Sequence, residues 1–317
     1  MTILITGIHG FVGSNLVESL KDKHTIFGLD IVAPEKDGVV KTFLWNDVVE
    51  TDNYPSLPVF DVVIHLAGKA HDTKNKADAK IYFEVNTELT KKIYDYFLQS
   101  KAQKFIFFSS VKAAADVVEN EILTEDVVPK PVGAYGESKI AAEEYILSQE
   151  PRAKSQDKQF YILRPCMIHG KGNKGNLNLL YGVVKKGVPY PLGAFENKRS
   201  FTSIDNLTFI INELLDKNIS SGIYNIADDE TLSTNELIVL MSKIMNKKVK
   251  IWNLSPKFIT FLAKIGTIIH FPLNSERLKK LTENYIVSNE KIKNALNISK
   301  LPITATEGFT KTIQSFG

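Results

Sequence analysis

Cysteine is almost absent from this sequence. Cys166 is the one cysteine among 317 residues, which excludes a disulfide within one chain and a cysteine-rich metal site. Such a composition is typical of a reducing compartment, and we expect a cytoplasmic protein. Histidines are also few, six in all, and they are scattered without the spacing of metal ligands, so we expect no metal.

An excess of charge of one sign and long hydrophobic runs are also lacking. The net charge of +3 is too small to indicate a nucleic-acid partner. Because the first apolar run follows Met1 directly, we expect no signal peptide. The most apolar later stretch, FITFLAKIGTIIHFPL (258–273), contains Lys264, Gly266 and His270 and is shorter than the about 20 apolar residues that span a bilayer. We expect no stable membrane insertion, and a helix that either packs in the ordinary way or lies at an interface.

Glycines, in contrast, are placed with a clear pattern near the N-terminus. The stretch ITGIHGFVG puts Gly7, Gly10 and Gly13 between an apolar run and a helical pattern. These positions suit a tight turn, a close approach of backbone to a ligand, and a helix packed closely on a sheet. The helix N-terminus then offers N–H groups to a pyrophosphate. The pattern predicts a dinucleotide-binding turn, with a ligand-free glycine turn as the alternative.

Apolar strands alternate with amphipathic helices through the first half of the chain. The expected strands are 3–5, 25–32, 41–48, 60–68, 104–111 and 160–165, and the expected helices are 76–99 and 135–149. This order predicts a parallel sheet covered on both faces, with ligands beyond the carboxyl ends of its strands. We therefore expect an α/β protein with a Rossmann-type doubly wound sheet in an NAD-binding domain (1–165). A smaller mixed α/β substrate-binding lobe (166–317) follows, with some segments returning to the first domain.

Asp30 ends the second expected strand, where the ribose of a dinucleotide would lie. Its carboxylate can accept hydrogen bonds from the ribose hydroxyls and would repel a 2′-phosphate. No arginine stands beside it to receive such a phosphate, so NAD is favoured over NADP. A solvent-exposed loop aspartate is the alternative.

The stretch PVGAYGESKIAAEEY carries the expected chemistry. Tyr135 and Lys139 stand at i and i+4 of one helix, so their side chains share a face. A tyrosine is a poor base at neutral pH, and a nearby ammonium group stabilises its phenolate. Tyr135 can then remove a proton from a substrate hydroxyl. Ser110 ends the fifth strand, at the ligand edge of the sheet.

These motifs together resemble the extended short-chain dehydrogenases/reductases, and among them the NAD-dependent nucleotide-sugar epimerase/dehydratase family. TGIHGFVG matches the family's TGxxGFxG motif, YGESK matches YxxxK, and FIFFSSVKA resembles the strand with the catalytic serine. The resemblance implies Ser110, Tyr135 and Lys139 as catalytic residues. It implies cofactor contacts from Gly7, Gly10, Phe11, Val12, Asp30, Asp47, Val48, Leu66, Ala67, Gly68, Asn86, Tyr135 and Lys139.

The second half resembles the family less sharply. LRPCMIHGKG is similar to the family's LRPxxVYGPG. The resemblance implies substrate contacts from Ser110, Asn176, Leu177, Arg199 and Arg277. Two guanidinium groups suit a diphosphate, because a fork of donors fits phosphate oxygens. For Arg277 the match is loose, and a surface arginine on a helix is the alternative.

One departure bears on the reaction. The family's dehydratases carry an acidic pair after the catalytic residue, whereas Val111 and Lys112 follow Ser110. Without that proton donor, dehydration is disfavoured. The loop after the serine strand also differs, because it reads AAAD at 113–116 where VYG is common.

The resemblance therefore implies NAD-dependent 4-epimerisation of a UDP-linked sugar through a transient 4-keto sugar, with a UDP-N-acetylhexosamine as the narrower expectation. It also implies a role in polysaccharide biosynthesis and a homodimer formed through helices 76–99 and 135–149. Three alternatives stay open. They are an NAD(P)H-dependent 4-keto-6-deoxy nucleotide-sugar reductase, an epimerase of a polyprenyl-diphosphate-linked sugar, and a catalytically silent NAD-sensing protein.

Overall fold

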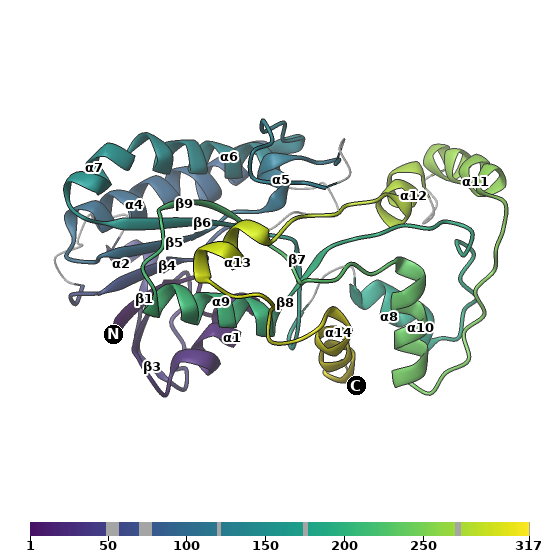
Figure 1. Cartoon of the computed structure of the whole chain (residues 1–317), viewed down its shortest axis with the longest axis horizontal. Helices are drawn as coiled ribbons and strands as arrows, with labels where there is room; N and C mark the ends of the chain where they lie inside the picture. The colour runs from purple at the N-terminus through teal and green to yellow at the C-terminus, as the bar shows by residue number, and fades with distance from the viewer. Residues whose placement is uncertain (49–56, 70–77, 119–121, 174–176, 270–273, 317) are drawn as a thin grey trace.

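A parallel sheet of seven strands forms the centre of the protein (Figure 1). The computed structural model describes residues 1–48, 57–69, 78–118, 122–173, 177–269 and 274–316, and the statements below concern these residues. The strands, in their order across the sheet, are β3 (Val39–Leu44), β2 (Thr25–Asp30), β1 (Thr2–Thr6), β4 (Val62–His65), β5 (Lys104–Phe108), β6 (Gln159–Pro165) and β9 (Gly222–Ile226). All neighbouring strands run parallel, which confirms the expected Rossmann-type sheet.

Helices cover both faces of this sheet because the apolar strands bury side chains on both sides. Ile3 and Ile5 of β1 belong to one core cluster, and Leu4 between them belongs to the other. The first cluster is covered by α1 (Phe11–Leu20), α9 (Ile204–Asp216) and α13 (Glu290–Leu296), and the second by α4 (Leu89–Gln99), α6 (Gly133–Ser148) and α7 (Glu150–Ser155). The sheet thus takes strand β9 and two covering helices from beyond residue 166.

The bounds of several expected elements differ from the structure, most clearly in two cases. The expected strand 41–48 ends at Leu44, and α2 (Trp45–Val48) follows it. The expected helix 76–99 is divided into α3 (Ala79–Phe83), a π-helical turn η2 (Glu84–Glu88), and α4. Side-chain hydrogen bonds from Asn86 and Thr87 to Ser138 of α6 hold this wider turn in place.

The second lobe is built around its own hydrophobic core, to one side of the sheet (Figure 1). Its elements are α8 (Leu177–Lys185), α10 (Thr234–Ile244), α11 (Pro256–Ile268), α12 (Ser275–Thr282), α14 (Ala305–Gln314) and a small parallel pair, β7 (Met167–His169) with β8 (Phe201–Ser203). α10 begins with a reciprocal capping box between Ser233 and Glu236.

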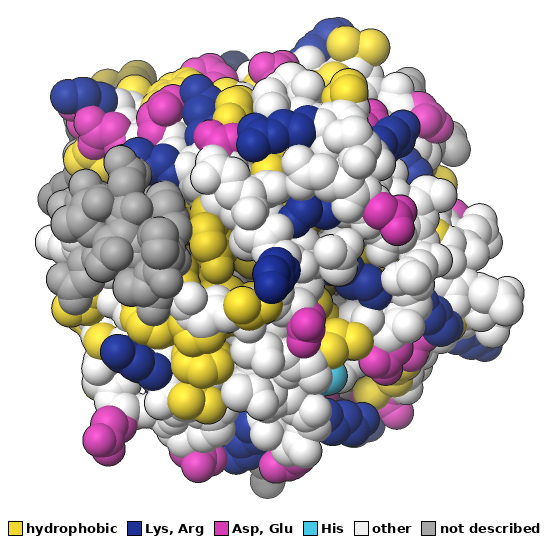
Figure 2. Space-filling model, turned by 90° about the vertical axis from the view of Figure 1, so that its left-hand side faces the viewer, with side chains coloured by type: hydrophobic (Ala, Val, Ile, Leu, Met, Phe, Trp, Pro, Cys, Tyr) yellow, Lys and Arg dark blue, Asp and Glu magenta, His cyan; other side chains and the backbone are white. Residues whose placement is uncertain are grey.

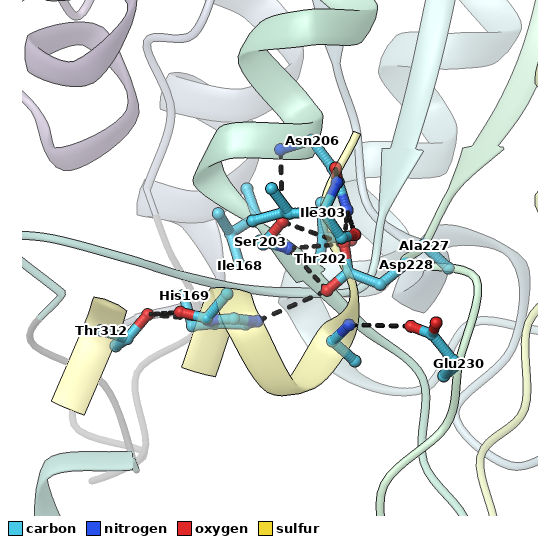
Figure 3. Close-up of polar contacts among 12 residues, drawn as sticks. Ile168, His169, Thr202, Ser203, Asn206, Ala227, Asp228, Glu230, Ile303 and Thr312 are labelled. Carbon is cyan, nitrogen blue, oxygen red and sulfur yellow. Dashed lines mark hydrogen bonds and ion pairs between the residues drawn. The ribbon is translucent and has the colours of Figure 1, made fainter. Parts of the chain in front are cut away.

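A buried polar network joins the lobe to the sheet, centred on Asp228 directly after β9 (Figure 3). The Asp228 carboxylate accepts hydrogen bonds from the backbone and hydroxyl of Ser203 and from the side-chain amide of Asn206. His169 stands 3.5 Å from the carboxylate, and its other ring nitrogen contacts the Thr312 hydroxyl at 2.9 Å. One carboxylate thus ties the end of β9 to β7, β8, α9 and α14.

Charges of both signs are interspersed on the end of the molecule shown in Figure 2, among small apolar patches. This distribution agrees with the nearly neutral composition. Within the part of the chain that the structure describes, no helix is long and apolar enough to cross a membrane.

Two buried lysines cap helices on opposite faces of the sheet. The Nζ of Lys104 donates hydrogen bonds to the carbonyls of Leu214, Leu215 and Lys217 at the end of α9, at 2.7–2.9 Å. The Nζ of Lys158 likewise donates to three carbonyls at the end of α4. Each cation satisfies carbonyls that lack a helical partner and lies at the negative end of a helix dipole.

We expect Lys104→Met to lower the free energy of unfolding by about 2–4 kcal/mol, because three buried carbonyls lose a charged donor. Urea unfolding followed by circular dichroism measures this loss. Lys101→Met, at an exposed position nearby in the chain, is the matched control. Equal stability losses in the two variants would contradict the capping role.

Candidate active site

The turn between β1 and α1 requires glycine at two positions. Gly7 has φ +68°, and a Cβ there would stand 2.9 Å from the backbone nitrogen of Ala67. A Cβ on Gly13 would stand 2.5 Å from the Gly7 carbonyl oxygen. The N-cap of α1, Gly10, makes no side-chain cap, and no acidic residue lies in the first turn. The N–H groups of this turn therefore suit an anionic ligand.

Asp30 lies at the carboxyl end of β2, beside this glycine turn. One carboxylate oxygen accepts a hydrogen bond from the His9 backbone at 3.0 Å, and the other accepts one from the Ile31 backbone at 2.7 Å. The side chain is 8 % exposed, so the alternative of a solvent-exposed loop aspartate is wrong. The two hydrogen bonds fix the carboxylate next to the turn.

The other expected cofactor residues of this half lie along the same edge of the sheet. Phe11 and Val12 begin α1 and are partly buried against the core, as is Leu66 directly after β4. Asp47 and Val48 end α2, and their side chains lie outside the described part of the structure.

Gly68, Asn86 and Lys139 meet although they are far apart in the sequence. A Cβ on Gly68 would stand 2.9 Å from the Asn86 side-chain oxygen and 3.1 Å from the Lys139 ammonium nitrogen. Asn86 is fully buried, and its side-chain amide makes hydrogen bonds to both backbone groups of Lys69. The Lys139 ammonium group also donates a 2.8 Å hydrogen bond to the carbonyl of Phe108, at the end of β5.

Ser110 and Tyr135 meet at the same edge. Ser110 follows β5, is 8 % exposed, and caps the short helix α5 (Val111–Ala114). The Tyr135 ring packs edge-on to Tyr82 with centroids 6.3 Å apart. Burial raises the pKa of the Tyr135 phenol, and a hydrogen bond with the Ser110 side chain partly offsets this rise. Tyr135 therefore stays protonated in the protein alone.

Lys139 is buried beneath this pair. Burial lowers the pKa of Lys139 to about 8, and the negative charge of Glu143 opposes that lowering. Burial, with a smaller contribution from the charge of Lys139, lowers the pKa of His65 of β4 to about 3, so this imidazole adds no charge near neutral pH. Glu143 thus favours the protonated form of Lys139 and opposes the effect of burial.

Glu143 belongs to a buried cluster that the sequence interpretation did not include. Its carboxylate is fully buried and contacts the Arg164 guanidinium of β6 at 2.5–3.1 Å. It also accepts a hydrogen bond from the Ser109 hydroxyl. The sequence does contain a pattern that points to Glu143. Glu143 follows Lys139 by four residues, as Lys139 follows Tyr135, so all three side chains share one face of the helix.

The expected substrate residues are not all brought together. The Arg199 guanidinium donates to the Lys280 carbonyl of α12, and burial lowers its pKa, opposed by Glu283. Arg277 is exposed at the start of α12. The Leu177 side chain is buried in the core of the lobe, which leaves its backbone as the group that can meet a ligand. Asn176 lies outside the described residues.

This edge of the sheet fits a dinucleotide. The uncapped N-terminus of α1 suits a pyrophosphate, and the fixed carboxylate of Asp30 suits the hydroxyls of an adenosine ribose. Ser110, Tyr135 and Lys139 lie at the same edge, where a substrate hydroxyl could exchange its proton with the phenol.

Comparisons with known proteins agree with this description. The model of the NAD dependent epimerase/dehydratase family matches residues 3–227. A UDP-glucose 4-epimerase of Vibrio cholerae is 32% identical over 99% of this chain and 95% of its own. An N-acetyl-alpha-D-glucosaminyl-diphospho-ditrans,octacis-undecaprenol 4-epimerase of Escherichia coli O157:H7 is 26% identical over 98% and 94%. The crystal structure of a Bacillus cereus UDP-glucuronic acid 4-epimerase with NAD has a TM-score of 0.75, at 21% identity over 99% and 98%.

These matches place the chain among the NAD-dependent enzymes that are built on a Rossmann-type sheet. More narrowly, the chain belongs to the NAD-dependent epimerase/dehydratase family.

We expect Glu143→Gln to lower the pKa of Lys139 further, because the opposing negative charge is lost while burial remains. If protonated Lys139 is needed for turnover, the alkaline decline of kcat/KM then moves to lower pH. A pH profile of the purified enzyme measures this shift, and Glu143→Asp should restore most of it.

Stability must be measured beside the profile, since an unpaired buried Arg164 costs about 3–5 kcal/mol. The double variant Glu143→Gln with Arg164→Met avoids the unpaired cation, and we expect a shift in the same direction but smaller, because a positive charge is removed together with the negative one. An unchanged alkaline decline in the stable variants would rule out this influence of Glu143 on Lys139.

Proposed function

We propose that this protein catalyses the NAD-dependent 4-epimerisation of a UDP-linked sugar, with a UDP-N-acetylhexosamine as the narrower proposal. The observation that carries the proposal is the hydrogen-bonded Ser110–Tyr135 pair above buried Lys139, at the edge that fits the dinucleotide. The similarity to a UDP-glucose 4-epimerase over nearly the whole chain supports it.

The residues after Ser110 favour epimerisation over dehydration. Val111 is 4 % exposed, and the Lys112 ammonium group is held by the Asp116 carboxylate at 2.9 Å. Neither offers the carboxylic acid that the acidic pair of a dehydratase would supply. A sugar bound here would therefore keep its 6-hydroxyl.

In this proposal, side chains of the protein accept and return the proton of the sugar's C4 hydroxyl. Tyr135 takes the proton from the C4 hydroxyl and returns it at the end of the cycle, and the Ser110 hydroxyl holds the reacting oxygen. Lys139 keeps a positive charge beneath the site and holds the cofactor ribose. When bound, NAD supplies the acceptor and donor of the C4 hydride and a positive charge that favours the Tyr135 phenolate. Arg199 is the guanidinium that we assign to the substrate diphosphate.

A second candidate is the same reaction on a sugar whose diphosphate is linked to a polyprenyl lipid. The observation that favours it is the similarity to the undecaprenol-linked epimerase along nearly the full length of both chains. The chemistry at C4 would be unchanged, since Ser110, Tyr135 and Lys139 act on the sugar and the lipid lies beyond the diphosphate.

Tyr135→Phe tests the base directly. The substitution removes one oxygen, and we expect kcat to fall by about 10²–10⁴-fold with little change in folding or NAD binding. Tyr82→Phe, which alters a buried phenol beside the same ring, is the matched control and should lose far less. Near-normal turnover by the Tyr135 variant would overturn its assignment as the base.

Cofactor handling separates the epimerase from a 4-keto reductase. An epimerase returns the hydride within each turnover, so we expect NAD to be retained through purification and UDP-N-acetylglucosamine to be epimerised with no cofactor added. Quantifying NAD(H) from denatured protein and resolving the product epimers measures both. Stoichiometric NAD(P)H consumption on a UDP-4-keto-6-deoxy sugar, with no epimer formed, would establish the reductase instead. Epimerisation of only a polyprenyl-diphosphate-linked sugar would establish the second candidate.

A further inference from the structure

Helix α11 (Pro256–Ile268) exposes an unusual number of large apolar side chains. Its buried residues are Ile259, Ala263 and Gly266, which face the core of the second lobe. The exposed ones, with their exposed fractions, are Phe258 (52%), Phe261 (59%), Leu262 (37%), Ile265 (38%), Ile268 (78%) and Ile269 (64%).

These exposed side chains form one continuous face. Phe261, Ile265 and Ile268 follow one another at helical spacings of four and three residues, so they lie along one line on the helix surface. Phe258 and Leu262 lie beside that line, separated by four residues. Trp252, 48% exposed, lies just before the helix. A soluble protein rarely exposes such a face unless something covers it.

The charged residues of α11 itself have one sign. Residues 252–269 contain no aspartate or glutamate, and Lys257 and Lys264 are both exposed on α11. Lys264 lies one helical turn from both Phe261 and Ile268, so it borders the apolar face. Helix α12, joined to α11 through Thr267 and Ser275, contains three cationic residues, Arg277, Lys279 and Lys280, and one acidic residue, Glu276.

The position of α11 leaves this face accessible. The helix lies at the outer end of the second lobe, far from the sheet and its carboxyl edge (Figure 1). Figure 2 shows a different surface at the sheet end of the molecule, where acidic and basic side chains are mixed. The lysine border without acidic residues is thus a local property of α11.

We infer that the apolar face of α11 (Phe258, Phe261, Leu262, Ile265, Ile268 and Ile269) docks the protein on an anionic phospholipid membrane surface. Aromatic and branched side chains on a helix that is too short to span can enter the headgroup boundary, while flanking lysines pair with lipid phosphates. The long lysine stems allow the charge to reach the headgroups beside a buried apolar face. This inference goes beyond the proposed function and does not depend on it.

Vesicle flotation of the full chain tests the inference. We expect binding to vesicles of phosphatidylcholine in which about a third of the lipid is phosphatidylglycerol, weaker binding to pure phosphatidylcholine, and a decrease with salt. The double variant Phe261→Ser with Ile265→Ser should lose at least about tenfold in affinity. Lys257→Gln with Lys264→Gln should lose about tenfold or more on the anionic vesicles and little on neutral ones.

Matched controls separate docking from general effects. Val188→Ser with Val239→Ser alters two exposed apolar residues of the same lobe, 47% and 57% exposed, and should bind vesicles as the natural protein does. The α11 variants should keep the natural thermal unfolding temperature and the natural turnover of a soluble UDP-sugar.

Three outcomes would overturn the inference. The first is an absence of flotation by the natural protein, and the second is flotation of the Phe261 and Ile265 variant at the natural level. The third is a loss of self-association in that variant, because a second copy of the chain would then be what covers the apolar face of α11. The turnover of a soluble UDP-sugar tests the proposed function separately. Vesicle binding without epimerisation of that sugar would contradict the proposed function and leave the membrane inference intact.

Discussion

The buried ion pair between Glu143 and Arg164 joins helix α6, which carries Tyr135 and Lys139, to strand β6 of the sheet. The pair joins the middle of α6 to β6 with both side chains almost fully buried. One helical turn earlier Lys139 reaches the carbonyl that ends β5, and one turn before that Tyr135 meets Ser110. A buried ion pair contributes little net stability, whereas an unpaired partner is costly. We therefore regard this ion pair as an interaction that fixes the position of α6 on the sheet and places the negative charge of Glu143 close to Lys139.

The burial of this part of α6 also sets the protonation of Tyr135, the base that we propose, and of Lys139. Burial raises the pKa of Tyr135 and lowers that of Lys139, so the protein alone keeps a neutral phenol above an ammonium group that is close to losing its proton. In the reaction that we propose, a cationic cofactor ring and a substrate hydroxyl would complete the arrangement. The negative charge of Glu143 opposes this effect of burial on Lys139.

The position of the second lobe relative to the sheet is fixed by a buried polar network. Asp228 ties it to the end of β9, so the elements that carry Arg199 stand at a fixed place beyond the carboxyl edge (Figure 3). At its outer end the lobe presents α11, whose apolar face has no partner among the residues that the structure describes. If the lobe docks on a membrane as we infer, the site lies near the membrane surface, where a sugar linked to a polyprenyl lipid is found. The inference from α11 would therefore agree with the second candidate function, epimerisation of a lipid-linked sugar.

The sequence by itself determined the glycine turn, the parallel sheet, Asp30 at the end of β2, and the Tyr135–Lys139 pair. These depend on local patterns, namely glycine positions, runs of apolar residues and i, i+4 spacing. Only the tertiary structure decided which distant side chains meet. The Glu143–Arg164 pair, the π-helical turn at Asn86, the burial of Leu177 and the exposure of α11 depend on which faces pack together. Helical spacing shows that apolar side chains share a face, but only packing decides whether another part of the chain covers that face.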